Sequence, residues 1–270
     1  MASTSNPDIN FAHLIGYHSV AAAVIFAILY IPLLGWFIFQ SFRRPTYVHF
    51  VLSFFCSIRV TAFIIRAILA GSDSAGHNLN LLIADEILFG VGFFGLLYSA
   101  YTLVLDRESL VDIAPPTNII SSLTRNRKLF RLAMTAAVAI GITGSSMSQD
   151  SSPQSVNTGS TLRKISAIIF LVLTVLQAYQ TCVLARMEMT SSGAYRHDNE
   201  SFGMKNGIFI LVAISLLLLI REAFSVATIG NLAKQNNEHF WYPLLALPEI
   251  LAVVLYATPG LVPPRAELPK

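Results

Sequence analysis

Seven long apolar stretches constrain this sequence more than any other feature, because each is close to the length that crosses a bilayer. They run approximately over residues 15–39, 47–70, 81–105, 129–147, 165–184, 207–230 and 243–261. A bilayer core of about 30 Å takes about 20 apolar residues per helix. Charged residues make up only 12% of the chain, against about 25% in soluble domains. The sequence therefore predicts an all-α integral membrane protein, a seven-transmembrane helix bundle that forms a single domain over residues 1–270.

Lysine and arginine are distributed unequally between the two sides of the predicted bundle. The loops at 43–44, 106–131 and 186–206, together with the C-terminal tail, hold twelve of them. The opposite side holds three, and the last three lie within the spans. By the positive-inside rule the richer side faces the cytosol. We therefore expect a lumenal or outside N-terminus and a cytosolic tail over residues 262–270.

Several ionisable residues fall inside the spans, and their positions place them in one layer. An ionised group at the bilayer centre costs at least ~2.5–3.5 kcal/mol on insertion scales, so such groups indicate a functional site. With the expected orientation and a helical rise of about 1.5 Å per residue, all of them lie in the middle or outer half of the membrane. They are Arg59, Arg66, Asp85, Glu86, Arg221, Glu222 and Glu249.

The arginines and carboxylates of this layer are unequal in number. Three arginines face four carboxylates, so complete pairing leaves one acid without a guanidinium. Burial favours the protonated form of such an acid, which could then act as a general acid. The alternative is that the layer consists of buried ion pairs that fix helix register, with the remaining acid solvated at the lumenal rim. Consecutive residues diverge by about 100° around a helix, so we expect the members of each adjacent pair, 85–86 and 221–222, to point in different directions.

Other polar features adjoin this layer or separate the spans. His18 lies one turn into the first span, where it either joins the site or is a satisfied interface histidine. Trp241 and Tyr242 precede the last span and are either substrate contacts or residues of the interfacial aromatic belt. The density of Pro, Ser, Gly and Asn predicts loops over 106–128 and 148–164. We expect neither a metal site nor another cofactor, because the two cysteines give no ligand set and no phosphate-binding loop is present.

Two groups of fungal membrane proteins share features with this chain. The stretch Arg221-Glu-Ala-Phe-Ser-Val-Ala-Thr-Ile-Gly230, followed by Glu238-His-Phe-Trp-Tyr242, resembles the fungal lipid-translocating exporter superfamily. The early span with Arg59 and Arg66 is similar to the arginine-bearing span of that group. Here Arg221 and Glu222 are adjacent rather than a turn apart, and the acid expected after Tyr242 is absent. The size and layout are also similar to membrane-bound terpene cyclases of fungal meroterpenoid pathways in secondary metabolism.

These resemblances imply two functions for the same polar cavity. The first is a terpene cyclase of the endoplasmic reticulum, an isomerase or lyase that protonates a prenylated, epoxidised, lipophilic substrate. Its candidate acids are Glu222 and Glu249, with Asp85 and Glu86 as partner or base. The candidate substrate-binding residues are Arg59, Arg66, Arg221, His18, Trp241 and Tyr242. The alternative is a lipid or sterol exporter or sensor that holds a headgroup there; both imply contact with membrane lipids and none with nucleic acid.

Overall fold

The protein is a bundle of antiparallel helices, seen in a computed structural model that describes residues 10–110, 124–148, 152–191 and 202–264. In these residues seven helical segments are long and apolar enough to cross a membrane, and no strand is found. The predicted all-α, seven-helix fold is thus confirmed, and the chain is a multi-pass membrane protein. The long elements are α2 (Val20–Arg43), α3 (Tyr47–Gly71), α5 (Leu79–Glu108), α7 (Arg127–Met147), α8 (Pro153–Ser191), α10 (Gly207–Thr228) and the continuous segment α12 (Glu238–Trp241), η1 (Tyr242–Ala246) and α13 (Leu247–Tyr256).

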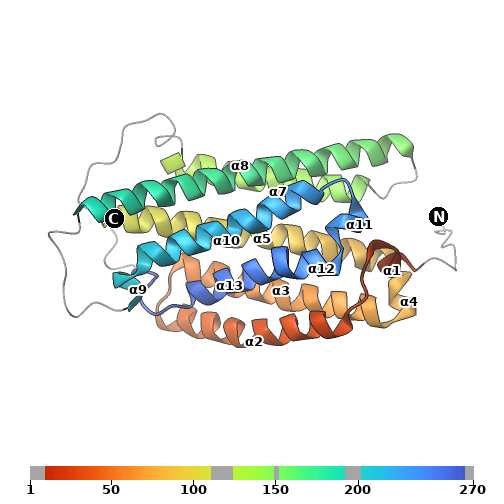
Figure 1. Cartoon of the computed structure of the whole chain (residues 1–270), viewed down its shortest axis with the longest axis horizontal. Coiled ribbons are helices and arrows are strands. Elements are labelled where there is room, and N and C mark those ends of the chain that lie inside the picture. The colour runs from red at the N-terminus through yellow and green to blue at the C-terminus, as the bar shows by residue number, and fades with distance from the viewer. Residues whose placement is uncertain (1–9, 111–123, 149–151, 192–201, 265–270) are drawn as a thin grey trace.

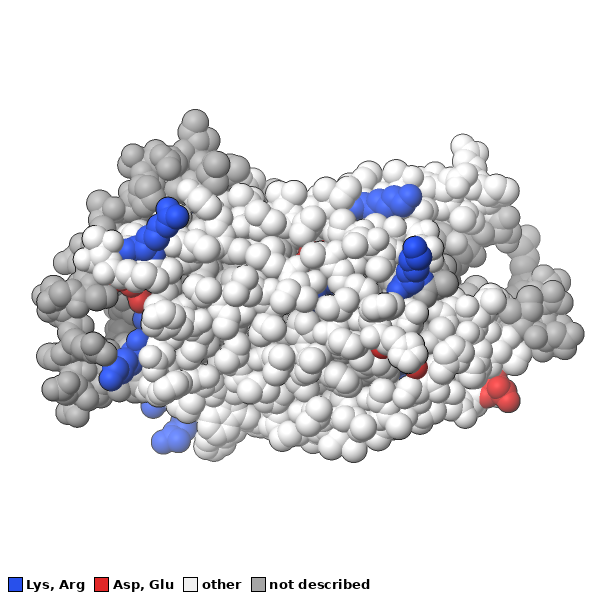
Figure 2. All heavy atoms as spheres, in the orientation of Figure 1, with Lys and Arg blue, Asp and Glu red and all other residues white. Residues whose placement is uncertain are grey.

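Short helices lie at the two ends of the bundle (Figure 1). One end carries α1 (Phe11–Ile15), α4 (Asp73–Gly76) and α11 (Leu232–Gln235), and the other carries α9 (Phe202–Lys205). We name these the outer end and the cytosolic end, after the expected orientation. On the face drawn in Figure 2, basic side chains lie toward the two ends, and few charged atoms are visible between them.

Helix α5 occupies the centre of the bundle and contacts α3, α7, α8 and α10. Around it, α2 packs on α3, α7 on α8, α8 on α10, and α10 on α13. Because α3, α5, α10 and α13 all adjoin this centre, charged side chains on their inner faces meet one another rather than lipid.

Side-chain caps define where several long helices begin. A polar side chain at the N-cap position accepts a hydrogen bond from a backbone N–H two or three residues later, which satisfies groups that the helix leaves unpaired. The capping residues are Ser19 for α2, Thr46 for α3, Asn78 for α5 and Asn126 for α7. For these four helices, the boundaries predicted from the sequence lie close to the observed ones.

Helix α8 differs from its prediction, because it begins at Pro153 rather than near residue 165. Most of the predicted loop over 148–164 is therefore helical. Its composition indicated a loop, but close contact with α7 supports the helix: a Cβ added at Gly159 would lie 2.5 Å from the backbone nitrogen of Ser148 and 2.7 Å from the carbonyl oxygen of Gly144. In the other predicted loop, α5 extends to Glu108 and α7 begins at Arg127, and residues 111–123 lie outside the described part of the chain.

Candidate functional site

A chain of buried ion pairs joins three helices in the middle of the bundle. Arg59 of α3 binds Glu249 of α13 through two hydrogen bonds, Nε to Oε2 at 2.7 Å and Nη2 to Oε1 at 2.8 Å. Arg221 of α10 donates from Nε to the same Oε1 at 3.0 Å and from Nη1 to Oε2 of Glu222 at 2.5 Å. We call these four residues the central network. All four side chains are buried, so each charge depends on its neighbours for compensation.

The two arginines of the central network also contact α5. Arg59 donates to the carbonyl oxygens of Leu88 at 3.0 Å and Phe89 at 3.1 Å. Its guanidinium lies 4.8 Å from the ring centroid of Phe89, and that of Arg221 lies 4.0 Å from the centroid of Phe93. Such cation–π contacts are worth about 0.5–2 kcal/mol, most where the cation is desolvated. Helix α5 thus supplies both backbone acceptors and aromatic faces to the two arginines.

A second buried pair lies nearer the outer end. Nη1 of Arg66 is 3.6 Å from Oδ2 of Asp85, and the Tyr17 hydroxyl donates to the same oxygen at 2.8 Å. The Arg66 guanidinium lies between two aromatic rings, 3.9 Å from the centroid of Tyr17 and 3.5 Å from that of Trp241. Burial raises the pKa of Tyr17 well above its usual value, so its hydroxyl remains a donor. Trp241 is only 3% exposed, which contradicts the interfacial-belt alternative for that residue.

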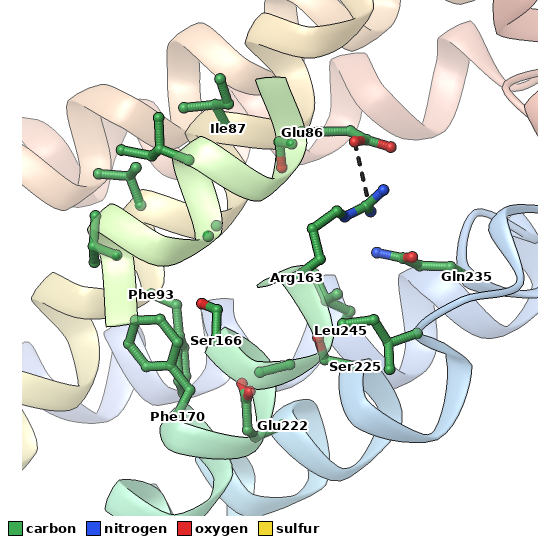
Figure 3. Close-up of a pocket in the computed structure, with 18 of the residues that line it drawn as sticks. Glu86, Ile87, Phe93, Arg163, Ser166, Phe170, Glu222, Ser225, Gln235 and Leu245 are labelled. Carbon is green, nitrogen blue, oxygen red and sulfur yellow. Dashed lines mark ion pairs between the residues drawn. The ribbon is translucent and has the colours of Figure 1, made fainter. Parts of the chain in front are cut away.

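Glu86 pairs with an arginine that the predicted layer did not include. Nη2 of Arg163, on α8, lies 3.6 Å from Oε2 of Glu86 (Figure 3). The expectation that one of the four carboxylates lacks a guanidinium is therefore wrong. Arg163 was counted in a loop, but the early start of α8 carries it into the helix, next to α5.

Two further expectations about single residues are corrected. Arg221 and Glu222 were expected to diverge, yet they form an ion pair, because the long arginine side chain reaches the carboxylate of the next residue. His18 lies before α2 rather than one turn inside it, since Ser19 is the N-cap. The carboxylate of Glu238 accepts hydrogen bonds from the backbone N–H groups of His18 and Ser19, each at 3.0 Å. This contact holds the outer end of α2 against α12.

A cavity of about 150 Å³ lies among α5, α7, α8, α10 and the segment around α11. Its apolar wall includes Phe93, Val138, Ile142 and Phe170. Glu86 and Arg163 lie on one side, and Glu222 and Ser225 on another (Figure 3). This half-open cavity can therefore hold a molecule with both a polar and an apolar part.

The candidate residues are divided between the cavity and the interior behind it. Glu86, Arg221 and Glu222 line the cavity, together with Tyr17, which the sequence interpretation did not single out. The remaining candidates do not line it; those are Arg59, Arg66, Asp85, Glu249, His18, Trp241 and Tyr242. Within the described residues, no group of three or more His, Cys, Asp or Glu side chains is placed to hold a metal ion.

The comparisons with known proteins give one match. Residues 16–198 match the family described as a domain of unknown function, DUF7702. The matched part contains the Arg66–Asp85 and Arg163–Glu86 pairs, whereas Arg221, Glu222 and Glu249 lie beyond it. Neither the curated proteins nor the solved structures that were compared with the chain gave a match. No named relative therefore supports the resemblance to the cyclases or to the exporters.

Proposed function

This chain belongs to the DUF7702 family, and we propose that it is a membrane protein that binds a lipid-like amphiphile, as an exporter or as a sensor. The observation that carries the proposal is the half-open cavity among α5, α7, α8 and α10. Part of its wall is apolar, and the arginines and glutamates in the rest of the wall are paired with one another. A membrane lipid or a similar lipophilic molecule has the matching division into headgroup and chain.

The size of the cavity limits how much of the ligand it encloses. Sites that enclose a drug-sized molecule measure about 300–1,000 Å³, against about 150 Å³ here. We propose that the headgroup and the first carbons occupy the cavity, while the rest of the chain leaves through its open side. With the N-terminus lumenal or outside, the headgroup lies in the outer half of the membrane.

A bulky side chain at Gly90 tests the proposal. Gly90 lines the cavity, and no atom lies within 4 Å of a Cβ added there, so Gly90→Phe fills the cavity without a clash at Cβ. We expect lipid extract to raise the unfolding temperature of the wild type but not that of this variant. Gly35→Phe is the matched control, because Gly35 is equally open but lies on α2, away from the cavity. Equal lipid stabilisation of the two variants would contradict the proposal.

A second candidate function is the terpene cyclase, located in the endoplasmic reticulum. Glu222 favours it, because this carboxylate lines the cavity (Figure 3). Within the described residues, Arg221 is its one ion-pair partner. A carboxylic acid at this place could protonate an epoxide or alkene, and the rings of Phe93 and Phe170 could stabilise the cation that forms. The reaction would need no metal ion.

Membranes that contain the protein and are fed a farnesylated phenol epoxide test this second function. Under the cyclase proposal we expect the wild type to release a cyclised product. Glu222→Gln should lower the rate by about 10²-fold or more, the usual contribution of a positioned general acid. Asp73→Asn, at an exposed acid outside the cavity, should cyclise the substrate as fast as the wild type. Absence of product with the wild type would exclude a cyclase for this substrate class while leaving lipid binding intact.

A further inference from the structure

We infer that the headgroup bound in this cavity is uncharged and carries both a hydrogen-bond donor and an acceptor, as a hydroxyl or a primary amide does. The inference rests on the proposed function and names the class of ligand that the site would take. Two independent observations carry it: the balance of charges around the cavity, and a pair of side-chain amides in its wall.

The charges around the cavity cancel. Two arginines and two glutamates line it, paired as Arg163 with Glu86 and Arg221 with Glu222. Behind them, the Arg59–Glu249 pair adds no net charge. A cationic or anionic headgroup would therefore enter a poorly solvated site without a free counterion, or would have to break an existing pair. Either event is costly in a region of low dielectric constant, so the charge balance favours a neutral headgroup.

Two amides in the cavity wall have unused hydrogen-bonding capacity. Oε1 of Gln235 and Nδ2 of Asn236 are buried and make no hydrogen bond within the described residues. Asn236 is 4% exposed, and both residues line the cavity. Figure 3 shows the side chain of Gln235 beside the Glu86–Arg163 pair. Buried polar groups in proteins nearly always have a hydrogen-bond partner. A ligand that donates to Oε1 of Gln235 and accepts from Nδ2 of Asn236 would supply the missing partners of both amides.

The backbone around these amides is held in place by the N-terminal segment. Gly16 has a φ of +105°, and a Cβ added there would lie 3.1 Å from the carbonyl oxygen of Asn236. The side chain of the next residue, Asn237, caps α12 through the backbone N–H of His239. Asn236 is therefore held by the Gly16 contact and by the helix cap that follows it, and Gln235 is the last residue of α11. This arrangement favours a preformed binding site.

Three amphiphiles with the same chain and different headgroups test the inference on the full-length protein in nanodiscs at neutral pH. Dodecanamide is neutral with donor and acceptor, dodecylamine is cationic, and dodecanesulfonate is anionic. We expect dodecanamide to bind with a Kd about tenfold lower than either charged analogue, since tenfold corresponds to the loss of about one buried polar interaction. Equal or tighter binding of a charged analogue would overturn the inference, whereas failure of all three to bind the wild type would overturn the proposed function as well.

Variants of the two amides identify the place of binding. Gln235→Ala and Asn236→Ala should each weaken dodecanamide binding about tenfold. Gln154→Ala, at an exposed amide of α8, should leave binding unchanged. Asn236→Asp places an unpaired carboxylate in the wall and should reverse the preference, so that dodecylamine binds more tightly than dodecanamide. This gain of affinity also shows that the variant is folded, and wild-type binding of dodecanamide by both alanine variants would overturn the assignment.

Discussion

Glu249→Gln is expected to destabilise the protein by about 3–5 kcal/mol, the usual cost of removing one partner of a buried ion pair. Glu249 accepts three hydrogen bonds from Arg59 and Arg221, and its side chain is fully buried. The neutral amide keeps the shape but leaves two guanidinium groups in the membrane with one carboxylate, Glu222. The measurement is the midpoint of thermal unfolding of the purified variant in detergent, with the yield of monodisperse protein as a second readout.

The control for this prediction removes both partners of one pair. Arg59→Met combined with Glu249→Leu replaces a buried pair by apolar side chains, a change that is often neutral or stabilising. Arg221 still keeps Glu222 in this double variant. We therefore expect the double variant to be more stable than Glu249→Gln alone. If the single variant unfolds at the wild-type temperature, the central network does not stabilise the bundle.

Gly92→Ala is expected to destabilise the protein by about 1–3 kcal/mol, the range for an extra methyl group in a well-packed interior. A Cβ at this position would lie 2.7 Å from Nη1 and 2.9 Å from Cζ of Arg59. The end of an arginine side chain can usually move aside, but this one is held by Glu249 and by the carbonyl oxygens of Leu88 and Phe89. The added methyl group therefore has to break part of the central network.

Gly90→Ala is the matched control, two residues earlier on the same helix. No atom lies within 4 Å of a Cβ at Gly90, so alanine there adds no clash. It should stabilise the helix by about 0.5–1 kcal/mol, because glycine loses more backbone entropy on folding. The comparison is made on unfolding midpoints under one set of conditions. Equal midpoints for the two variants would show that Arg59 is not confined as described.

Hydropathy alone predicted the number and class of the helices, because membrane spans have a length and composition that few other segments share. The layer of charges was also predictable in part. Arg59 and Arg66 are seven residues apart, a spacing that puts both on one face of a helix, and both guanidinium groups lie within 6 Å of the ring centroid of Phe89. Asp85 and Glu86 diverge as predicted, the first toward Arg66 and the second toward Arg163.

The remaining parts of the site depend on contacts between distant segments. Arg163 lies in a polar stretch whose helix is supported by the contact between Gly159 and α7. Tyr17 precedes the first long helix and reaches Asp85, 68 residues later, only because α1 folds over the outer end. The signal in each case was weak: an arginine near a predicted boundary, and a tyrosine next to a span. Composition and periodicity do not identify such partners, because they describe one segment at a time.

The bond between Arg59 and Glu249 has a consequence for the order of events on the ribosome. The two residues are 190 positions apart, so at about 5–20 residues per second the arginine is synthesised roughly 10–40 s before its carboxylate. During that interval α3 carries a guanidinium that is costly to leave in lipid. We expect the nascent α3 to remain beside the insertion machinery, or at the membrane surface, until the last helix emerges. Insertion of the last span, which carries Glu249, would then complete the membrane integration of α3. In a nascent chain that ends before residue 249, we expect α3 to be incompletely integrated.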